Sequence, residues 1–440
     1  MTTDNEITVI GGGLAGCEAA WQAARSGCRV TLYEMKPRKF SPAHSSPDLA
    51  ELVCSNSLRS DDPGSAVGLL KEEMAGFNSL IIEAARATRV PAGRALAVDR
   101  EKFAELITGR INENPQITIR REELPALPPA GENPVILATG PLTSGEMAAS
   151  LAELTGREHL AFYDAIAPIV AADSLDMNIV YRASRYDEGP GDYLNCPMDR
   201  EQYHAFIAAL AEGDRVPLKS FEKQKYFEGC LPIEIMLERG EDTLRFGPMK
   251  PVGLPDPRTG RDPHAVVQLR LENREGTTCN MVGFQTKLTY AAQREVFRLI
   301  PGLEKVEFTR MGSIHRNTFV RGPEVLRATL QTKMRPDLFL AGQLTGVEGY
   351  LESTAMGLLA GLNAARLAAG LELLAPPADT ALGALIRHLT DSEPKRFQPS
   401  NINFGLFPAV KLRMPKKQRG QYRAEQARKS LEKWRHQESI

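Results

Sequence analysis

The sequence predicts an α/β protein in which a Rossmann-like, nucleotide-binding domain is interrupted by an inserted mixed α+β domain. Three observations indicate this. A strand, a glycine turn, a helix and another strand follow one another in "ITVIGGGLAGCEAAWQAARSGCRVTLYEMKP". A second strand, glycine-rich loop and long helix follow in "DLFLAGQLTGVEGYLESTAMGLLAGLNAA". Between them the pattern changes to polar, aromatic and proline-punctuated segments, and the 440 residues suffice for two or three domains of ~100–200 residues.

The first βαβ unit is predicted from local patterns. Residues 7–10 form a β-branched run and predict a strand, and the alanine-rich residues 14–26 predict a helix. Residues 30–33 are apolar again and predict the second strand.

The turn between the first strand and the helix matches G-x-G-x-x-G at Gly11, Gly13 and Gly16. The first glycine permits the tight turn, the second lets the backbone approach a pyrophosphate, and the third lets the helix pack on the strand. Glu34 lies at the end of the second strand, where a carboxylate binds a ribose hydroxyl and favours FAD or NAD over NADP. The alternative is a glycine turn in some other βα unit. The turn expected to bind the cofactor comprises Gly11, Gly12, Gly13, Leu14, Ala15 and Gly16.

Two later segments favour FAD over NAD. The strand in "NPVILATGPLT" leads into Gly140, and the second loop contains Gly342, Gln343 and Gly346 before a helix that we expect to start near Ser353. The positive end of that helix would face the flavin pyrimidine edge, where negative charge accumulates on reduction. The alternative is a glycine-rich packing turn. Tyr350 is expected beside the isoalloxazine, to stack on flavin or pterin, or else simply to cover the loop.

The domain boundaries follow from the change of pattern. We expect residues 1–198 and 312–440 to form the discontinuous FAD-binding domain and residues 199–311 to form the insertion. Alternation in "HAVVQLRLEN" predicts a strand within the insertion.

The charge distribution points to one local basic segment. The formal net charge is −1, so a polyanion would have to bind a concentrated patch, and "KLRMPKKQRGQYRAEQARKSLEKWRHQESI" supplies one. Ala424, Ala427, Leu431 and Trp434 recur at helical spacing, which predicts a helix that docks through an apolar stripe and presents its basic groups elsewhere. Such a helix would contact RNA phosphates without sequence specificity. The alternative is a solvated, ion-paired C-terminal helix.

Location and metal content are bounded by absences in the sequence. The start of the chain lacks the pattern of a signal peptide, and no apolar run is long and clean enough for a membrane span, so we expect a cytoplasmic protein. The six cysteines form no C-x-x-C pair, and we expect no metal site. No obligate protein partner is indicated.

Two cysteines are candidates for chemistry. Cys54, in "ELVCSNSLRS", precedes turn-forming residues and is expected where a strand or helix ends, accessible and tuned. Cys230, in "QKYFEGCLPIEIM", has lysines nearby that would favour the nucleophilic thiolate. The alternative for Cys230 is a buried thiol at a turn.

A resemblance extends over nearly the whole chain. The segments "GGGLAGCEAAWQAARSGCRVTLYEMKP", "LVCSNSLRS", "FEGCLPIE", "RFGPMKPVGL" and "LFLAGQLTGVEGYLESTAMGLLAGLNAA" together resemble the TrmFO family, the folate- and FAD-dependent tRNA (uracil-5-)-methyltransferases. The last segment also resembles the related MnmG (GidA) flavoproteins, which are longer and end differently.

The TrmFO resemblance implies a reaction and roles for the thiols. Methylenetetrahydrofolate would supply the carbon, FAD would mediate its transfer, and NADPH or NADH would be the reductant. The substrate would be the T-loop uridine of the tRNA T-arm. Because C5 of uracil is a poor nucleophile until a thiolate adds at C6, the resemblance implies Cys230 as nucleophile and Cys54 as base or flavin-side partner, with the division of roles open. The alternatives are an MnmG-like tRNA-modifying flavoprotein, a flavin oxidoreductase without an RNA substrate, and a non-catalytic RNA-binding flavoprotein.

Overall fold

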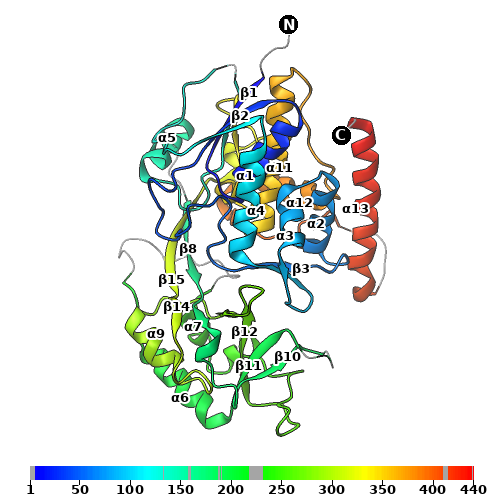
Figure 1. Cartoon of the computed structure of the whole chain (residues 1–440). Coiled ribbons are helices and arrows are strands. Elements are labelled where there is room, and N and C mark those ends of the chain that lie inside the picture. Colours follow the sequence, from blue (N-terminus) through cyan, green and yellow to red (C-terminus); the bar gives the residue numbers. More distant parts are fainter. Residues whose placement is uncertain are drawn as a thin grey trace.

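The computed structural model describes residues 5–131, 133–156, 160–186, 189, 191–217, 231–409, 415–438 and 440. It has an upper part built on a parallel sheet and a lower part built on an antiparallel sheet, joined by two long strands (Figure 1). The joining strands, β8 (Leu160–Ile166) and β15 (Ser313–Phe319), pair with each other along their whole lengths. Among the described residues, none of the helices combines the length and the apolarity that crossing a bilayer requires.

The first sheet is a five-stranded parallel sheet in the order β16-β7-β1-β2-β6. Its strands are β16 (Leu338–Leu340), β7 (Val135–Leu137), β1 (Glu6–Ile10), β2 (Arg29–Tyr33) and β6 (Ile117–Arg120). A smaller sheet in the order β3-β5-β4 lies nearby and consists of β3 (Ser57–Ser60), β5 (Ala95–Val98) and β4 (Arg89–Val90). The α/β class with a Rossmann-like first domain is therefore confirmed.

Glycines allow the two central helices of the first domain to cross closely. Helix α1 (Leu14–Arg25) packs on α11 (Tyr350–Ala368), and a Cβ atom at Gly357 or Gly361 would overlap the backbone of Ala15 or Ala19. This explains the alanine- and glycine-rich composition of both helices, because larger residues at the crossing would push the helices apart. The other helices of this domain are α2 (Ala66–Gly76), α3 (Leu80–Ala87), α4 (Arg100–Glu113), α5 (Gly145–Thr155), α10 (Gly322–Val325) and α12 (Ala381–Asp391).

The C-terminal helix α13 (Lys416–Glu438) lies along the outside of the first domain, next to α2 (Figure 1). The predicted stripe is confirmed, because Ala424, Ala427, Leu431 and Trp434 are all buried. The Trp434 ring meets the edge of Phe77 at a centroid distance of 6.2 Å. The helix thus docks through the apolar stripe that its spacing predicted.

The second sheet is antiparallel, with its strands in the order β10-β11-β12-β13-β9-β14. Its strands are β10 (Tyr181–Ala183), β11 (Tyr193–Met198), β12 (Ala265–Leu271), β13 (Thr278–Met281), β9 (Ile169–Ala171) and β14 (Phe308–Arg310). The helices of this part are α6 (Arg200–Glu212), α7 (Ile233–Leu237), α8 (Thr243–Phe246) and α9 (Tyr290–Phe297).

This sheet begins earlier in the chain than residue 199, where the sequence pattern changes most visibly. Strands β9, β10 and β11 precede that residue, and the buried Val170 and Val180 belong to the core of the second sheet. The antiparallel sheet thus starts at Ile169, within the segment 1–198 that the sequence assigned to the FAD-binding domain. The domain division itself, 1–198 with 312–440 against 199–311, stays a prediction.

Candidate functional site

A pocket opens where strands β1, β2, β7 and β16 of the parallel sheet end. It encloses about 1180 Å³ between atoms, its open mouth included. Ligands of open α/β sheets bind at this edge, beyond the carboxyl ends of the strands. The predicted cofactor residues that line this pocket are Gly11, Gly12, Gly13, Leu14, Ala15, Glu34, Gly140, Gly342, Gln343 and Tyr350.

Two predicted residues, Gly16 and Gly346, shape the turns and do not line the pocket. A Cβ atom at Gly16 would overlap the carbonyl oxygen of Gly11, so this glycine lets α1 approach the first turn. Gly346 has φ of 100°, and a Cβ atom there would lie 2.5 Å from the Phe397 ring. Their absence from the lining does not remove them from the site, because both determine the course of the backbone that forms it.

The start of α1 is suited to an anion. Gly13 precedes the helix without a side-chain cap, and no acidic residue lies in the first turn. A Cβ atom at Gly13 would meet no atom within 4 Å, which means that this backbone faces open space. Free amide groups and the positive end of the helix dipole favour a phosphate at such a place. The residues present therefore fit a dinucleotide cofactor.

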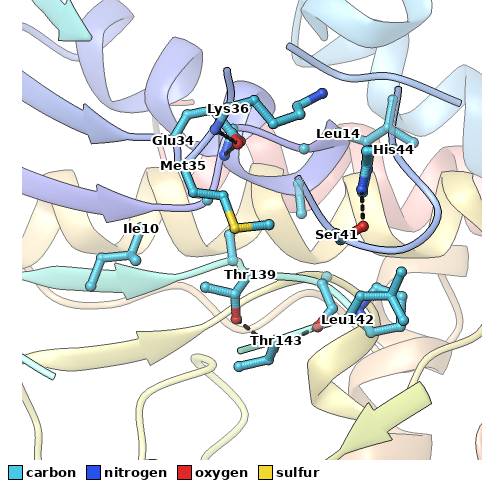
Figure 2. A pocket seen from close by; sticks show the side chains of 18 of the residues that line it. Ile10, Leu14, Glu34, Met35, Lys36, Ser41, His44, Thr139, Leu142 and Thr143 are labelled. Carbon is cyan, nitrogen blue, oxygen red and sulfur yellow. Dashed lines mark hydrogen bonds between the residues drawn. The ribbon is translucent and has the colours of Figure 1, made fainter. Parts of the chain in front are cut away.

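The Glu34 carboxylate closes one side of the pocket (Figure 2). It accepts a hydrogen bond from the backbone N–H of Gly12 and one from the backbone N–H of Lys36, both at 2.8 Å. Each oxygen keeps a further lone pair that can accept from a ribose hydroxyl. The carboxylate therefore holds the glycine turn as well as offering the predicted sugar contact.

Sequence reasoning missed the loop that follows Glu34. Lys36 is buried, and its ammonium donates to the Asp48 carbonyl at 2.5 Å and to the Glu51 carboxylate at 3.1 Å. Ser41 Oγ lies 2.6 Å from His44 Nδ1 at the pocket wall (Figure 2). Burial and the Lys36 charge lower the pKa of His44. The sequence signal that could have found this loop is its composition: it is rich in proline and serine, contains one histidine and directly follows Glu34.

Cys54 lies beside this pocket, next to Tyr350 on the first turn of α11. The backbone N–H groups of Cys54 and Ser55 donate to the Tyr350 hydroxyl oxygen at 2.8 and 3.2 Å. Cys54 Sγ lies 3.1 Å from the same oxygen. Because both lone pairs of the hydroxyl are taken by the amides, its proton is donated to the sulfur. Tyr350 therefore positions the thiol.

The expectation of an accessible, tuned thiol at position 54 stays a prediction, and the structure shows which groups act on this thiol. The residue is half-buried, and burial, followed by the charge of Asp164, raises the pKa of Cys54 to about 12. The hydrogen bond from Tyr350 and the charge of Arg100 act in the opposite direction. Cys54 is thus held as a thiol, the form that cannot act as a base until its surroundings change.

Two acidic residues near Cys54 were not predicted. Burial and the charge of Asp164 raise the pKa of Glu348 well above its ordinary value, although a hydrogen bond donated by Gln343 Nε2 at 2.6 Å favours the carboxylate. Asp164 lies on β8, opposite His315 on β15. Glu348 lies in the second glycine-rich loop, between Gly346 and Gly349, and this position was the sequence signal that could have found it.

Cys230 lies outside the described residues, so its role stays a prediction. The described chain resumes at Leu231, which is buried and lies shortly before α7. Burial raises the pKa of Glu234 on that helix. The other cysteines, Cys17, Cys28, Cys196 and Cys279, are buried. Within the described ranges, no group of three or more His, Cys, Asp or Glu side chains is arranged to hold a metal ion.

The basic helix α13 is connected to the first turn of α11 through residues 402–404. The Arg423 guanidinium donates to the Phe404 carbonyl at 2.5 Å and lies 5.8 Å from the centre of its ring. The backbone N–H of Ile402 donates at 2.7 Å to Glu352, on the first turn of α11.

Part of the positive charge of α13 is used in internal contacts. Arg428 pairs with Glu72 of α2 at 2.8 Å. The side chains of Arg419, Lys429 and Lys433 are exposed, whereas Lys411 and Arg413 lie outside the described residues. The helix therefore combines a docking role with a basic outer surface.

Comparison with known proteins gives consistent results. The glucose inhibited division protein A family matches residues 6–372. A protein of Desulfotalea psychrophila named methylenetetrahydrofolate–tRNA-(uracil-5-)-methyltransferase TrmFO is 66% identical over 434 residues, which cover 99% of this chain and 98% of that protein. A protein of the same name from Citrifermentans bemidjiense is 59% identical over 430 residues, covering 98% of both chains.

Solved structures show the same fold at low identity. The form II crystal structure of Aquifex aeolicus GidA has a TM-score of 0.66 and 17% identity, and the match covers 98% of this chain and 74% of that chain. The form I crystal of the same protein gives a TM-score of 0.66 and 19% identity, covering 97% and 76%.

Proposed function

The chain belongs to the TrmFO family, within the GidA-related group, and from this membership we propose that it transfers one carbon from methylenetetrahydrofolate to C5 of a uridine in tRNA. The observation that carries the proposal is a thiol held by a tyrosine hydroxyl beside a pocket that fits a dinucleotide. A fold alone would not indicate chemistry, whereas a thiol beside a pocket that fits a dinucleotide supports the proposal that Cys54 transfers a proton there.

FAD is the proposed occupant of the pocket. The amide groups at the start of α1 would hold its pyrophosphate, and Glu34 would accept from the ribose. The first turn of α11, with Tyr350 and Ser353 in the lining, would face the flavin ring. When bound, FAD supplies reducing equivalents and mediates transfer of the carbon. The proposed reductant of the flavin is NADPH or NADH.

The two thiols have proposed roles at the pyrimidine. Cys230 would add to C6 of the uracil and so make C5 nucleophilic, and Cys54 would remove the C5 proton once the carbon is attached. As the carbon is reduced to a methyl group, the Cys230 sulfur would leave C6 as a thiolate and restore the C5–C6 double bond. Because the pKa of Cys54 is raised to about 12, we infer that substrate binding must change its surroundings before it acts as a base. The hydrogen bond from Tyr350 already favours the thiolate in this structure, so the change must come from the other groups around Cys54.

The T-arm of tRNA is the proposed RNA partner. Both C5 and C6 must be accessible, so we infer that the T-loop uridine is flipped out of its stack. The exposed cations Arg419, Lys429 and Lys433 would contact RNA phosphates. Affinity for tRNA should then fall steeply with salt concentration. The substrate implies a cytoplasmic place of action.

A labelling experiment tests the proposal. Purified, flavin-loaded protein is incubated anaerobically with unmodified tRNA, NADPH and methylenetetrahydrofolate labelled in the methylene carbon, and the expected product is labelled 5-methyluridine in the T-loop. Oxidation of NADPH without label in tRNA would instead indicate a flavin oxidoreductase and reject the proposal. Label at a different uridine would reject the T-loop assignment alone.

Variants test the roles of the thiols. Cys230→Ala and Cys54→Ala should each abolish labelling while the flavin absorbance is retained, because other segments form the cofactor pocket. Cys28→Ala, which removes a buried thiol in the turn between α1 and β2, is the matched control and should label normally. Full activity of either site variant would contradict the assigned role.

A further inference from the structure

The loop that carries Cys54 lies at the junction of the two domains. At its start, the Leu52 carbonyl accepts a hydrogen bond from Arg100, the first residue of α4. At its end, the fully buried Asn56 donates through its side-chain amide to the Val98 carbonyl of β5 at 2.9 Å. These contacts come from the first domain, and they hold both ends of the loop.

The second sheet holds the same loop through one guanidinium. Arg270 on β12 is 6% exposed, and its Nε donates to Asn56 Oδ1 at 2.8 Å. Its Nη2 donates to Ser55 Oγ at 2.9 Å. The Asn56 amide donates in return to the Leu271 carbonyl at 3.0 Å. One side chain of the second sheet therefore binds the two residues that directly follow Cys54.

Ion pairs join the same junction around the loop. The Arg100 guanidinium pairs with Glu272, which follows β12 directly, at 2.8 Å. Lys102 on the outer face of α4 pairs with Glu275 and does not touch the loop. The charged and titratable groups that act on the thiol come from several elements: Arg100, Arg270 and Arg310, the acids Asp164 and Glu348, and Tyr350.

We propose that Arg270 is a positioning residue: it holds Ser55 and Asn56, and so it keeps the Cys54 thiol against Tyr350. The position of this thiol therefore depends on how the second sheet docks on the first domain. The backbone N–H of Ser55 donates to the Tyr350 hydroxyl, so a shift of Ser55 moves that contact directly. Displacement of the second sheet would release the loop and expose the thiol to solvent. The consequence for catalysis rests on the proposed function, whereas the positioning itself does not.

Alkylation of the thiol measures this positioning without any turnover. Flavin-loaded protein is treated with iodoacetamide between pH 7 and pH 10, and modification of the Cys54 peptide is followed by mass spectrometry after digestion. Arg270→Met leaves Asn56 Oδ1 without its donor and removes one of the two donors of Ser55 Oγ, which keeps the Ser57 N–H. The loop should therefore loosen, and the pKa of Cys54 should fall from about 12 towards the ordinary 9.0. Because the thiolate is the reactive form, alkylation of Cys54 should become roughly tenfold faster or more.

Control and fallback variants keep the outcome decisive. Lys102→Met removes an ion pair across the same junction without touching the loop, and it should leave the alkylation rate unchanged. Ser55→Ala removes one of the two Arg270 contacts, together with the acceptor of the Ser57 backbone N–H, and should give a smaller acceleration. This variant decides the matter if Arg270→Met does not retain flavin.

The opposite results would overturn the proposal. Unchanged or slower alkylation in Arg270→Met and Ser55→Ala would mean that the guanidinium acts only through its charge or not at all. Equal acceleration in Lys102→Met would mean that any loosening of the junction suffices, without a special role for Arg270. Absence of methylation in every variant and in the unmodified protein would reject the proposed function but leave the alkylation result valid.

Discussion

Replacing Tyr350 by phenylalanine should destabilise the first domain by more than the loss of a single donated hydrogen bond. The hydroxyl oxygen accepts from two backbone amides, at 2.8 and 3.2 Å, and phenylalanine leaves both N–H groups without this acceptor. Each partly buried amide deprived of its acceptor costs about 1–3 kcal/mol, so we expect a total loss of about 3 kcal/mol. The ring is kept, so flavin binding should change little.

The assay is urea unfolding of flavin-loaded protein, followed by circular dichroism and by flavin fluorescence. Tyr181→Phe is the matched control, because the Tyr181 hydroxyl only donates, to the Leu254 carbonyl at 2.8 Å. Its removal should cost about 1 kcal/mol. A Tyr350→Phe protein as stable as the unmodified protein, or destabilised no more than Tyr181→Phe, would refute the reasoning that the hydroxyl organises the Cys54 loop.

Three further changes test the fold and the pocket. Gly16→Ala should reduce flavin content and stability, because the added methyl group overlaps a carbonyl of the glycine turn. Gly109→Ala is the control: a Cβ atom there meets no atom within 4 Å, so this change should be neutral or stabilise the protein. Urea unfolding measures the stability of both variants, and flavin absorbance measures their flavin content. Trp434→Ala removes a buried ring packed on Phe77 and should cost about 3–5 kcal/mol and weaken tRNA binding in a gel-shift assay. Burial lowers the pKa of His44 below 6.5, so below that pH the unfolded chain binds more protons than the folded protein does. The free energy of unfolding should therefore fall as the pH drops below about 6.5. His44→Gln should remove this contribution to the pH dependence.

Local patterns predicted the elements that form the cofactor pocket. The strand, glycine turn and helix of the first unit were predicted at 7–10 and 14–26 and occur at Glu6–Ile10 and Leu14–Arg25. These predictions agree with the structure because the periodicity of apolar side chains and the residue preferences of turns depend on a few neighbouring residues. The start of α11 differs from the expectation near Ser353, because Gly349 at φ of 105° precedes the helix and the helix begins at Tyr350. As a result Tyr350 belongs to the helix and points its hydroxyl at Cys54.

The sequence by itself determined that the chain has a Rossmann-like domain, a dinucleotide turn, a ribose acid and a C-terminal helix with an apolar stripe, because each depends on residues that are close in the chain. Only the tertiary structure decided how the thiol is held. Cys54 meets Tyr350 across 296 residues, and Asn56 meets Arg270 across 214. Such contacts depend on which strands pair and on how the two sheets dock. The periodicity of neighbouring residues contains no information about either. The same packing buries the thiol, and so it raises a pKa that the turn-forming residues alone would have left near its ordinary value.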